Sequence, residues 1–174
     1  MSIAIPSPKR WTVEECYRLQ EAGHLEGRYE LIEGVIVDKM GQNPRHARFL
    51  SNLILCLESI FSMKYIRVQA PIALPTPYGT YNEPEPDAVV TKESVITYTH
   101  HPLPDDLLLV AEVSDSSLDF DRRTKVPLYA KAGITEFWIL DVAERKLYVY
   151  QEPTETGYRL THLYTEQDAV VLAA

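Results

Sequence analysis

Two short apolar runs, each bordered by a carboxylate, stand out in the pattern of hydrophobic and polar positions. Residues 88–90 and 107–111 are continuous runs of valine, leucine and alanine, which is typical of buried strands. Asp87 precedes the first run and Glu112 follows the second. A carboxylate at the end of a buried strand is costly unless something pairs with it. We therefore expect both side chains to have partners.

Further strand-like segments of alternating or branched apolar residues recur along the chain. In one of them, prolines restrict the segment to a sheet edge or to an interrupted strand. The predicted segments are 29–38 (two short strands around a turn at Glu33 and Gly34), 65–74 (the segment with prolines), 134–142 with 144–151 (a second hairpin) and 158–164.

Capping residues mark the starts of two helices. Thr12 with Glu15 three positions later has the pattern of a capping box, which predicts a helix that ends near Gly23. Asn43 followed by Pro44 marks the start of a second helix. Apolar residues at three- and four-residue spacing predict its core face. That face consists of Leu50, Leu53, Ile54, Leu57, Ile60 and Phe61.

A third helix is predicted after Glu112. Asp121, Lys125 and Tyr129 recur at four-residue spacing, so one helix face would carry all three. Pro127 disturbs this pattern, because proline suits a first turn or a kink. By itself, the spacing also fits a solvated Lys125 that pairs only with Asp121.

Length and composition favour one ordinary globular domain, residues 1–174. Cys16 and Cys56 lie in helical patterns with apolar neighbours, which predicts two reduced core residues and no disulfide or zinc site. His100 and His101 are adjacent in a predicted loop and make a poor chelate. No apolar run approaches about 18 residues, so we expect no membrane partner and a cytoplasmic location.

The acidic charge of the chain is concentrated in one window. The net charge of −8 argues against a non-specific nucleic-acid binder, because such proteins are usually basic. Residues 83–121 contain ten Asp or Glu and one Lys, whereas the rest of the chain contains fifteen acidic and sixteen basic residues. The net acidity therefore surrounds Asp87 and Glu112. A cation site would have this pattern, and so would an acidic surface loop.

Each candidate residue has a chemical and a structural interpretation, and the sequence pattern alone does not decide between them. On neighbouring strands, Asp87 and Glu112 could share a hard divalent cation such as Mg²⁺. Acidic residues also border strands for structural reasons, since Pro-Asp is a common turn dipeptide. Glu30 fits a solvated strand face. His46 fits the rim of a packed helix as well as a ligand or phosphate contact.

Taken in order, several segments resemble the Uma-type restriction endonuclease family, a branch of the PD-(D/E)XK nuclease superfamily. No single segment is specific, but their order and spacing together are. The segments are Tyr-Glu-Leu-Ile-Glu-Gly at residues 29–34, His46, Pro86-Asp87, Glu112-Val113-Ser114, the series Asp121, Lys125 and Tyr129, and Gly-Ile-Thr-Glu-Phe-Trp-Ile-Leu-Asp at residues 133–141.

The resemblance implies an α/β fold of the restriction-endonuclease type, with a mixed central sheet flanked by helices and with additional β-hairpins. The core of this fold would span about residues 29–142. The resemblance also implies that Asp87 and Glu112 are metal ligands, helped by the backbone carbonyl of Val113. The implied cofactor is Mg²⁺, with Mn²⁺ as a substitute.

The superfamily places a lysine two residues after the acid, where this chain has Ser114. The resemblance implies that Lys125 supplies this function from the following helix and that Glu30 is a further catalytic acid. We expect the Lys125 ammonium within salt-bridge distance of Glu112 or Asp87. We expect Lys125 at the rim of the pocket, so truncation of its side chain should lower the stability of the protein only slightly.

The implied function is a metal-dependent DNA endonuclease that acts as a homodimer. One rival interpretation is a non-catalytic nucleic-acid- or protein-binding module on the same scaffold. Another is an unrelated α/β domain in which Asp87 and Glu112 lie far apart and form surface ion pairs. Because the protein is acidic, DNA contacts must be local. The candidates for these contacts are His46, Arg45, Arg48, Arg122 and Arg123.

Overall fold

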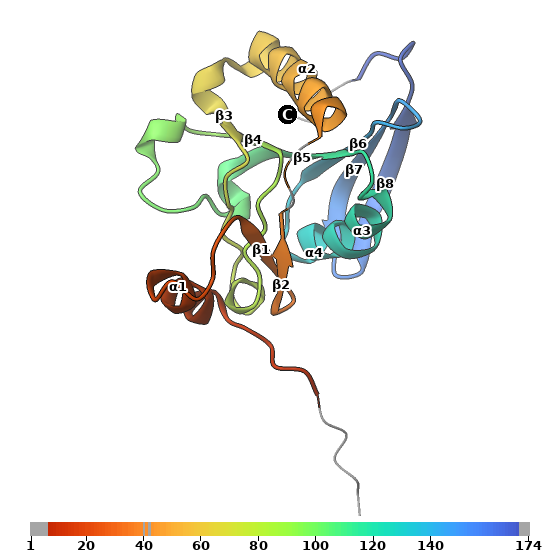
Figure 1. The fold of residues 1–174 in the computed structure, drawn as a ribbon. Coiled ribbons are helices and arrows are strands. Elements are labelled where there is room, and N and C mark those ends of the chain that lie inside the picture. Colours follow the sequence, from red (N-terminus) through yellow and green to blue (C-terminus); the bar gives the residue numbers. More distant parts are fainter. Residues whose placement is uncertain (1–6, 40, 42, 171–174) are drawn as a thin grey trace, which may run out of the picture.

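A mixed six-stranded sheet forms the centre of the molecule (Figure 1). The computed structural model describes residues 7–39, 41 and 43–170. In spatial order the strands are β3 (Ile66–Val68), β4 (Ala88–Thr91), β5 (Leu107–Ser114), β6 (Glu136–Asp141), β7 (Lys146–Thr154) and β8 (Gly157–Tyr164). β5 and β6 are parallel, and the other neighbouring pairs are antiparallel. This arrangement confirms the predicted mixed sheet, and β3 lies at its edge as expected.

Helices cover both faces of this sheet, as Figure 1 shows. One long helix lies on one face, and a broken helix and a two-stranded hairpin lie on the other. The helices are α1 (Val13–Glu21), α2 (Pro44–Phe61, the long one), and α3 (Leu118–Phe120), a π-helical turn (Asp121–Lys125) and α4 (Val126–Lys131), which form the broken one. The hairpin is β1 (Tyr29–Ile32) with β2 (Val35–Asp38), and 3₁₀ turns span Met63–Tyr65, Tyr78–Thr80, Val95–Thr97 and Pro104–Asp106.

Strand alternation determines which face carries each side chain. Val89 and Val110 pack in the core that includes residues of α4 and β1, whereas Ala88 packs in the core that includes α2. Asp87 lies two residues before Val89, and Glu112 lies two residues after Val110. Both carboxylates therefore point toward the face that the broken helix and the hairpin cover.

The register of β4 and β5 places the two carboxylates opposite each other. Ala88 pairs with Ala111 in this antiparallel pair, so the next step along both chains sets Asp87 opposite Glu112. Side chains at directly opposite positions have Cβ atoms about 4.5–5.5 Å apart. The interpretation as an unrelated domain with distant carboxylates is therefore wrong.

The broken helix is the crossover between the parallel strands β5 and β6. Parallel strands cannot be joined by a tight turn, so the chain crosses one face of the sheet before it returns. In the π turn, the amide of Val126 donates to the carbonyl of Asp121, and Pro127 follows in the first turn of α4. Asp121, Lys125 and Tyr129 are all buried, which confirms the predicted face.

Both predicted helix starts are also confirmed. Thr12 and Glu15 form a capping box at α1, and the side chain of Asn43 accepts a hydrogen bond from the amide of His46 at the start of α2. These caps satisfy amide groups that a helix start leaves without intrahelical partners. None of the helices in the described ranges is long and apolar enough to cross a membrane.

Two predictions about the core positions of α2 are wrong. Ile60 is 55% exposed, because it lies in the last turn and at the margin of the stripe that buries Leu53 and Leu57. Cys56 is exposed, because it is about 100° around the helix from Leu57. Cys16 is buried and both thiols are free, as expected.

Candidate active site

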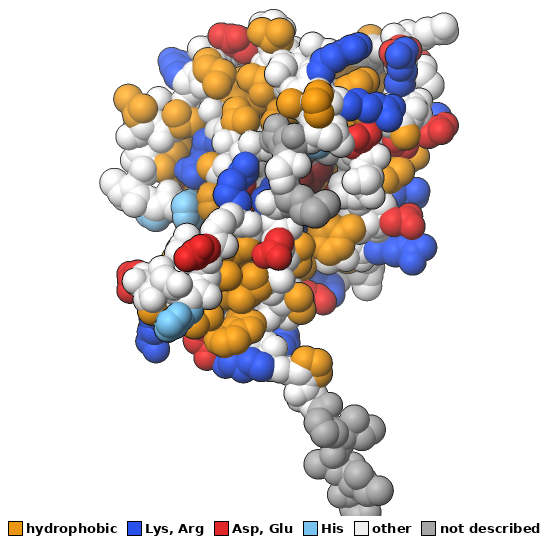
Figure 2. Space-filling view, viewed as in Figure 1, with side chains coloured by type: hydrophobic (Ala, Val, Ile, Leu, Met, Phe, Trp, Pro, Cys, Tyr) orange, Lys and Arg blue, Asp and Glu red, His pale blue; other side chains and the backbone are white. Residues whose placement is uncertain are grey.

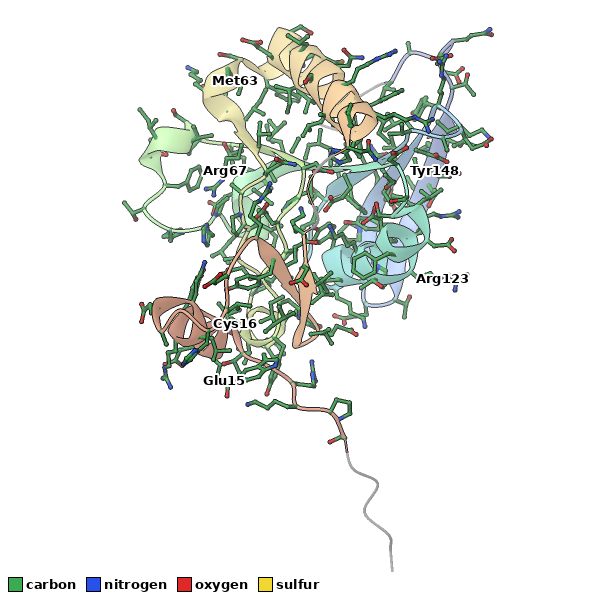
Figure 3. The ribbon with its side chains drawn as sticks, in the orientation of Figure 1. Glu15, Cys16, Met63, Arg67, Arg123 and Tyr148 are labelled. Atoms are coloured by element: carbon green, nitrogen blue, oxygen red, sulfur yellow. The ribbon has the colours of Figure 1, made fainter. Side chains whose placement is uncertain are left out.

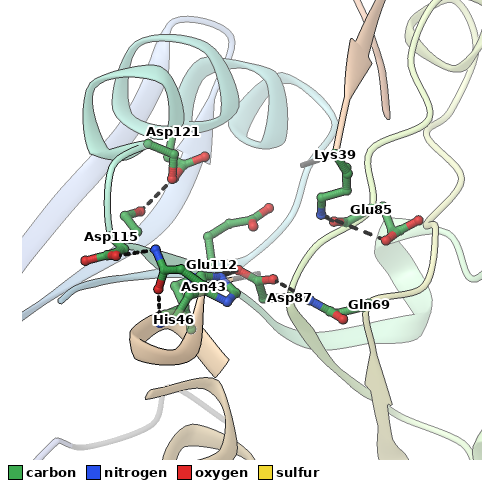
Figure 4. Close-up of polar contacts among 12 residues, drawn as sticks. Lys39, Asn43, His46, Gln69, Glu85, Asp87, Glu112, Asp115 and Asp121 are labelled. Carbon is green, nitrogen blue, oxygen red and sulfur yellow. Dashed lines mark hydrogen bonds and ion pairs between the residues drawn. The ribbon is translucent and has the colours of Figure 1, made fainter. Parts of the chain in front are cut away.

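A pocket of about 310 Å³ lies over Asp87 and Glu112. Figure 4 shows these two side chains beside each other, with the start of α2 on one side and Gln69 on another. The pocket is built from segments that are far apart in the sequence. They are the hairpin with Glu30 and Lys39, the start of α2 with Asn43 and His46, the end of β5 with Val113, and the crossover with Asp121 and Lys125.

Asp87 is held by three donors. The amide of Val113 donates to its Oδ2 at 2.9 Å, and the Nε2 of His46 lies 3.2 Å from the same oxygen. The side-chain amide of Gln69 donates to Oδ1 at 3.2 Å. Burial acts to raise the pKa of Asp87, but the bonds from His46 and Val113 outweigh it and lower this pKa below its usual value. The contact with Asp87 in turn raises the pKa of His46.

Glu112 is buried beside a lysine and a tyrosine. Its Oε1 accepts a hydrogen bond from Lys125 Nζ at 2.7 Å and one from the hydroxyl of Tyr129 at 3.1 Å. Burial raises the pKa of Glu112 to about 8, the charge of Lys125 opposes this rise, and the charge of Asp87 adds to it. A further positive charge in the pocket would therefore favour the ionised form of Glu112.

Lys125 lies among three carboxylates. Besides Glu112, its ammonium lies 3.1 Å from Glu30 Oε1 and 3.8 Å from Asp121 Oδ1. Burial opposes its charge, but Glu112, Glu30 and Asp121 raise the pKa of Lys125 above its usual value. The predicted salt bridge to Glu112 is confirmed. The expectation of a rim position is wrong, because Lys125 is only 3% exposed.

Glu30 is buried, so the solvated strand face does not describe it. Its Oε1 accepts a hydrogen bond from the amide of Glu85 at 2.7 Å and pairs with Lys125. The hairpin alone would leave this face of β1 in water. The loop that precedes Asp87 and the crossover cover it instead, and they bring Glu30 into the same cluster as Glu112.

Ser114, two residues after Glu112, forms a contact with the crossover. The hydroxyls of Ser114 and Ser117 both donate to Asp121 Oδ2, at 2.6 and 2.7 Å. Asp121 Oδ1 faces the ammonium of Lys125. This chain of contacts joins the end of β5 to the π turn and fixes the place from which Lys125 enters the cluster.

Lys39 and Gln69 are pocket residues that sequence reasoning missed. Lys39 Nζ lies 3.9 Å from Glu30 Oε1 and the same distance from Glu85 Oε1. A signal for Lys39 was present, because Glu30 pairs with Val37 in the hairpin and Lys39 lies diagonally across on the same face. Gln69 adopts an uncommon positive φ of 48° after β3, which no sequence pattern indicated.

The residues predicted to contact DNA do not all lie at the pocket. His46 lines the pocket. Arg45 lies at its margin, where it pairs with Asp115 at 3.3 Å. Arg48 lies next to Phe49 on α2, outside this pocket. Arg122 lies over the ring of Tyr148, and the side chain of Arg123 is 82% exposed and points outward (Figure 3). The structure thus does not bring Arg122 and Arg123 to the pocket.

The donor set fits a hard divalent cation. Asp87 and Glu112 offer carboxylate oxygens from opposite positions of one strand pair, and the backbone of Val113 lines the same pocket. Within the described ranges, no three His, Cys, Asp or Glu side chains form a closed cage. Mg²⁺ is usually held by one or two carboxylates and completes its coordination with water and phosphate oxygens. An open pair of carboxylates therefore suits it.

Comparisons with known proteins agree with this geometry. The chain belongs to the Uma2 family, described as "Putative restriction endonuclease", whose model matches residues 13–174. This membership supports a nuclease function in general terms. No curated protein matches the chain.

A solved structure from Anabaena variabilis, described as a putative nuclease belonging to DUF820, has the same fold with a TM-score of 0.63. The two share 18% sequence identity, and the match covers 88% of this chain and 87% of the other. At this identity the likeness is one of fold, and it agrees with the mixed sheet described above.

Proposed function

We propose that this protein is a metal-dependent DNA endonuclease that hydrolyses phosphodiester bonds in the pocket over Asp87 and Glu112. Mg²⁺ is the proposed cofactor, and Mn²⁺ a substitute. Asp87, Glu112 and the carbonyl of Val113 would hold the ion. When bound, the cation supplies Lewis-acid catalysis and makes water reactive near neutral pH.

The residues of the chain have separate roles in this proposal. Lys125 offsets the charge of Glu112 and Glu30, and from the same place it stabilises negative charge that develops on the phosphate. Glu30 keeps the ammonium of Lys125 in position, 3.1 Å away. His46 and Gln69 hold the Asp87 carboxylate in one orientation. Tyr129 holds one oxygen of Glu112, and no described residue donates to the other.

One observation carries the proposal. Asp87 and Glu112 lie opposite each other in one pocket, and a buried lysine from another segment lies 2.7 Å from Glu112. A buried cluster of this kind is costly for stability alone, since apolar side chains of similar volume often serve as well or better. Clusters of ionisable groups with shifted pKa values in a pocket are typical of active sites.

A cleavage assay tests this function. Supercoiled plasmid and single-stranded DNA are incubated with the protein in Mg²⁺, in Mn²⁺ and in EDTA. We expect nicking or linearisation in either metal ion and none in EDTA. Asp87→Asn and Glu112→Gln should each lose cleavage. Asp105→Asn, at an exposed position of the 3₁₀ turn before β5, is the matched control and should keep it.

Two outcomes would contradict the proposal. Cleavage that survives in EDTA or in both site variants would move the chemistry elsewhere. A protein that binds DNA and never cleaves it with any divalent ion would favour the non-catalytic binding module instead. The proposed homodimer, which would present two sites to a duplex, is tested separately by light scattering of the free protein.

A further inference from the structure

A second pocket, of about 400 Å³, lies on the other side of the first turn of α2. It is lined by Pro44, Arg45, Arg48 and Phe49 from α2 and by Arg145 from the turn between β6 and β7. Three arginines thus meet in one pocket, although the whole chain has a net charge of −8. Figure 2 shows Lys and Arg side chains gathered at the upper right, in the region of the start of α2.

The positive charge of this pocket is only partly neutralised by the protein. Arg45 pairs with Asp115 at 3.3 Å and also donates to the carbonyl of Val142 at 2.9 Å, which fixes its position. Arg145 pairs with Glu166 at 3.3 Å across exposed surface, where such a pair contributes little. Arg48 forms no ion pair with any residue in the described part of the chain. The pocket therefore has donors available for an anion.

The second pocket is next to the active-site pocket. Asn43 and His46, in the first turn of α2, line the active-site pocket, while Arg45 of the same turn lines the second. Asp115 connects the two, because it lines the active-site pocket and accepts a hydrogen bond from Asn43 while it pairs with Arg45. One extended strand can therefore have groups in both pockets.

We propose that the second pocket binds a backbone phosphate of the nucleic-acid strand whose neighbouring phosphate lies over Asp87 and Glu112. Arginine forks match phosphate oxygens in a bidentate way, and phosphate contacts fix the register of a strand without reading its sequence. Arg48 and Arg145 are the positioning residues of this subsite. The inference rests on the proposed nuclease function and assigns the side of the pocket along which the strand runs.

Binding experiments test the subsite without cleavage. Fluorescence anisotropy measures the affinity of wild type and of the double variant Arg48→Gln/Arg145→Gln for a labelled 20-nucleotide DNA in Ca²⁺, over a range of salt concentrations. We expect the double variant to bind at least tenfold more weakly and to lose about two units of the salt slope, one for each lost contact. Arg159→Gln, an exposed arginine on β8 that pairs with Glu152, is the control and should bind like wild type.

A chemical change in the DNA makes the test specific. A neutral methylphosphonate is placed at one linkage at a time. In wild type it should weaken binding most at a single linkage beside the scissile one, and in the double variant that linkage should have no added effect. Thermal unfolding of all variants verifies that they are folded.

The outcomes separate this inference from the proposed function. Equal binding by wild type and the double variant overturns the subsite, whether or not the protein cleaves DNA. Weaker binding by the variant in a protein that never cleaves supports the subsite and overturns the nuclease. Inorganic phosphate could instead bind to wild type and not to the double variant, while both proteins have the same affinity for DNA. That result would mark a site for free anions and would overturn the inference.

Discussion

The ammonium of Lys125 lies 2.7 Å from the carboxylate of Glu112, and both side chains are buried. Glu112 lies in the core strand β5, two residues before its end, and Lys125 comes from the π turn of the crossover, so the contact joins the sheet to the helix that covers it. Removing one member of a buried pair leaves the other charge without a partner, which typically costs about 3–5 kcal/mol. The same contact is thus both structural and central to the proposed chemistry.

Above about pH 8, where Glu112 is ionised, Lys125→Met should therefore lower the free energy of unfolding by about 3–5 kcal/mol. The apolar side chain leaves Glu112 without its cation, and it leaves Glu30 with Lys39 alone, 3.9 Å away. Urea denaturation measures this loss. Lys131→Met, at an exposed position of α4, is the control and should change stability little. If Lys125→Met is as stable as the control, the cluster does not depend on this cation. A double-mutant cycle that combines Lys125→Met with Glu112→Gln measures the interaction energy between Lys125 and Glu112.

Stability should depend on the ionisation of Glu112. Its pKa is about 8 in the folded protein against an ordinary value of 4.5, so the folded state binds a proton that the unfolded state has lost. This contribution is complete below about pH 4.5 and is lost as the pH rises through about 8. In EDTA, the free energy of unfolding of wild type should fall relative to Glu112→Gln over that range, by a few kcal/mol, since one pKa unit is about 1.4 kcal/mol.

The difference in free energy of unfolding between wild type and Glu112→Gln removes the effect of the other titrating groups, because both proteins have them. Above about pH 8 this difference should become constant. A difference that does not change with pH would mean that Lys125 keeps Glu112 ionised throughout.

Added Mg²⁺ should stabilise the protein through the proposed ligands. An ion that binds only the folded state at 100 times its dissociation constant adds about 2.7 kcal/mol to the free energy of unfolding. Urea denaturation with and without Mg²⁺ measures this gain at pH 8. Asp87→Asn should abolish the gain, whereas Asp105→Asn should retain it. A gain that survives in Asp87→Asn would place the ion elsewhere.

The hydrogen bonds to Asp121 should be needed for the crossover. Asp121→Ala leaves the hydroxyls of Ser114 and Ser117 without their acceptor and should cost about 1–3 kcal/mol of stability. Asp119→Ala, at a side chain that is 88% exposed in α3, is a matched control and should cost little. Equal midpoints in urea for the two variants would show that Asp121 does not hold the π turn.

Local patterns explain why much of the fold was predictable. The caps at Thr12 and Asn43 and the turn at Glu33 and Gly34 depend on neighbouring residues, and all three are confirmed. The exposed Ile60 was not foreseen, because the helix period does not show how far along α2 the buried stripe extends.

The candidate site was predictable only in part. Asp87 and Glu112 could be found because each borders a core run, and Lys125 because of the resemblance. The burial of Glu30 and the approach of Lys39 depend on how the hairpin packs against the loop before Asp87, which is a contact between distant segments. No local pattern carries that information.

The π turn has a consequence for which changes in chain length this family could accept. A π turn closes on five residues where an α turn closes on four, so Asp121–Lys125 holds one residue more than a regular helix would. Deleting that residue would restore a regular helix and would leave α4 close to its present orientation, because the π turn and an α turn each complete about one circuit. Deleting one residue of α4 before Tyr129 would instead rotate the rest of the helix by about 100°. Tyr129 would then leave Glu112. An alignment of relatives should therefore show gaps in the π turn, and in the turn between β7 and β8, before it shows any between Lys125 and Tyr129.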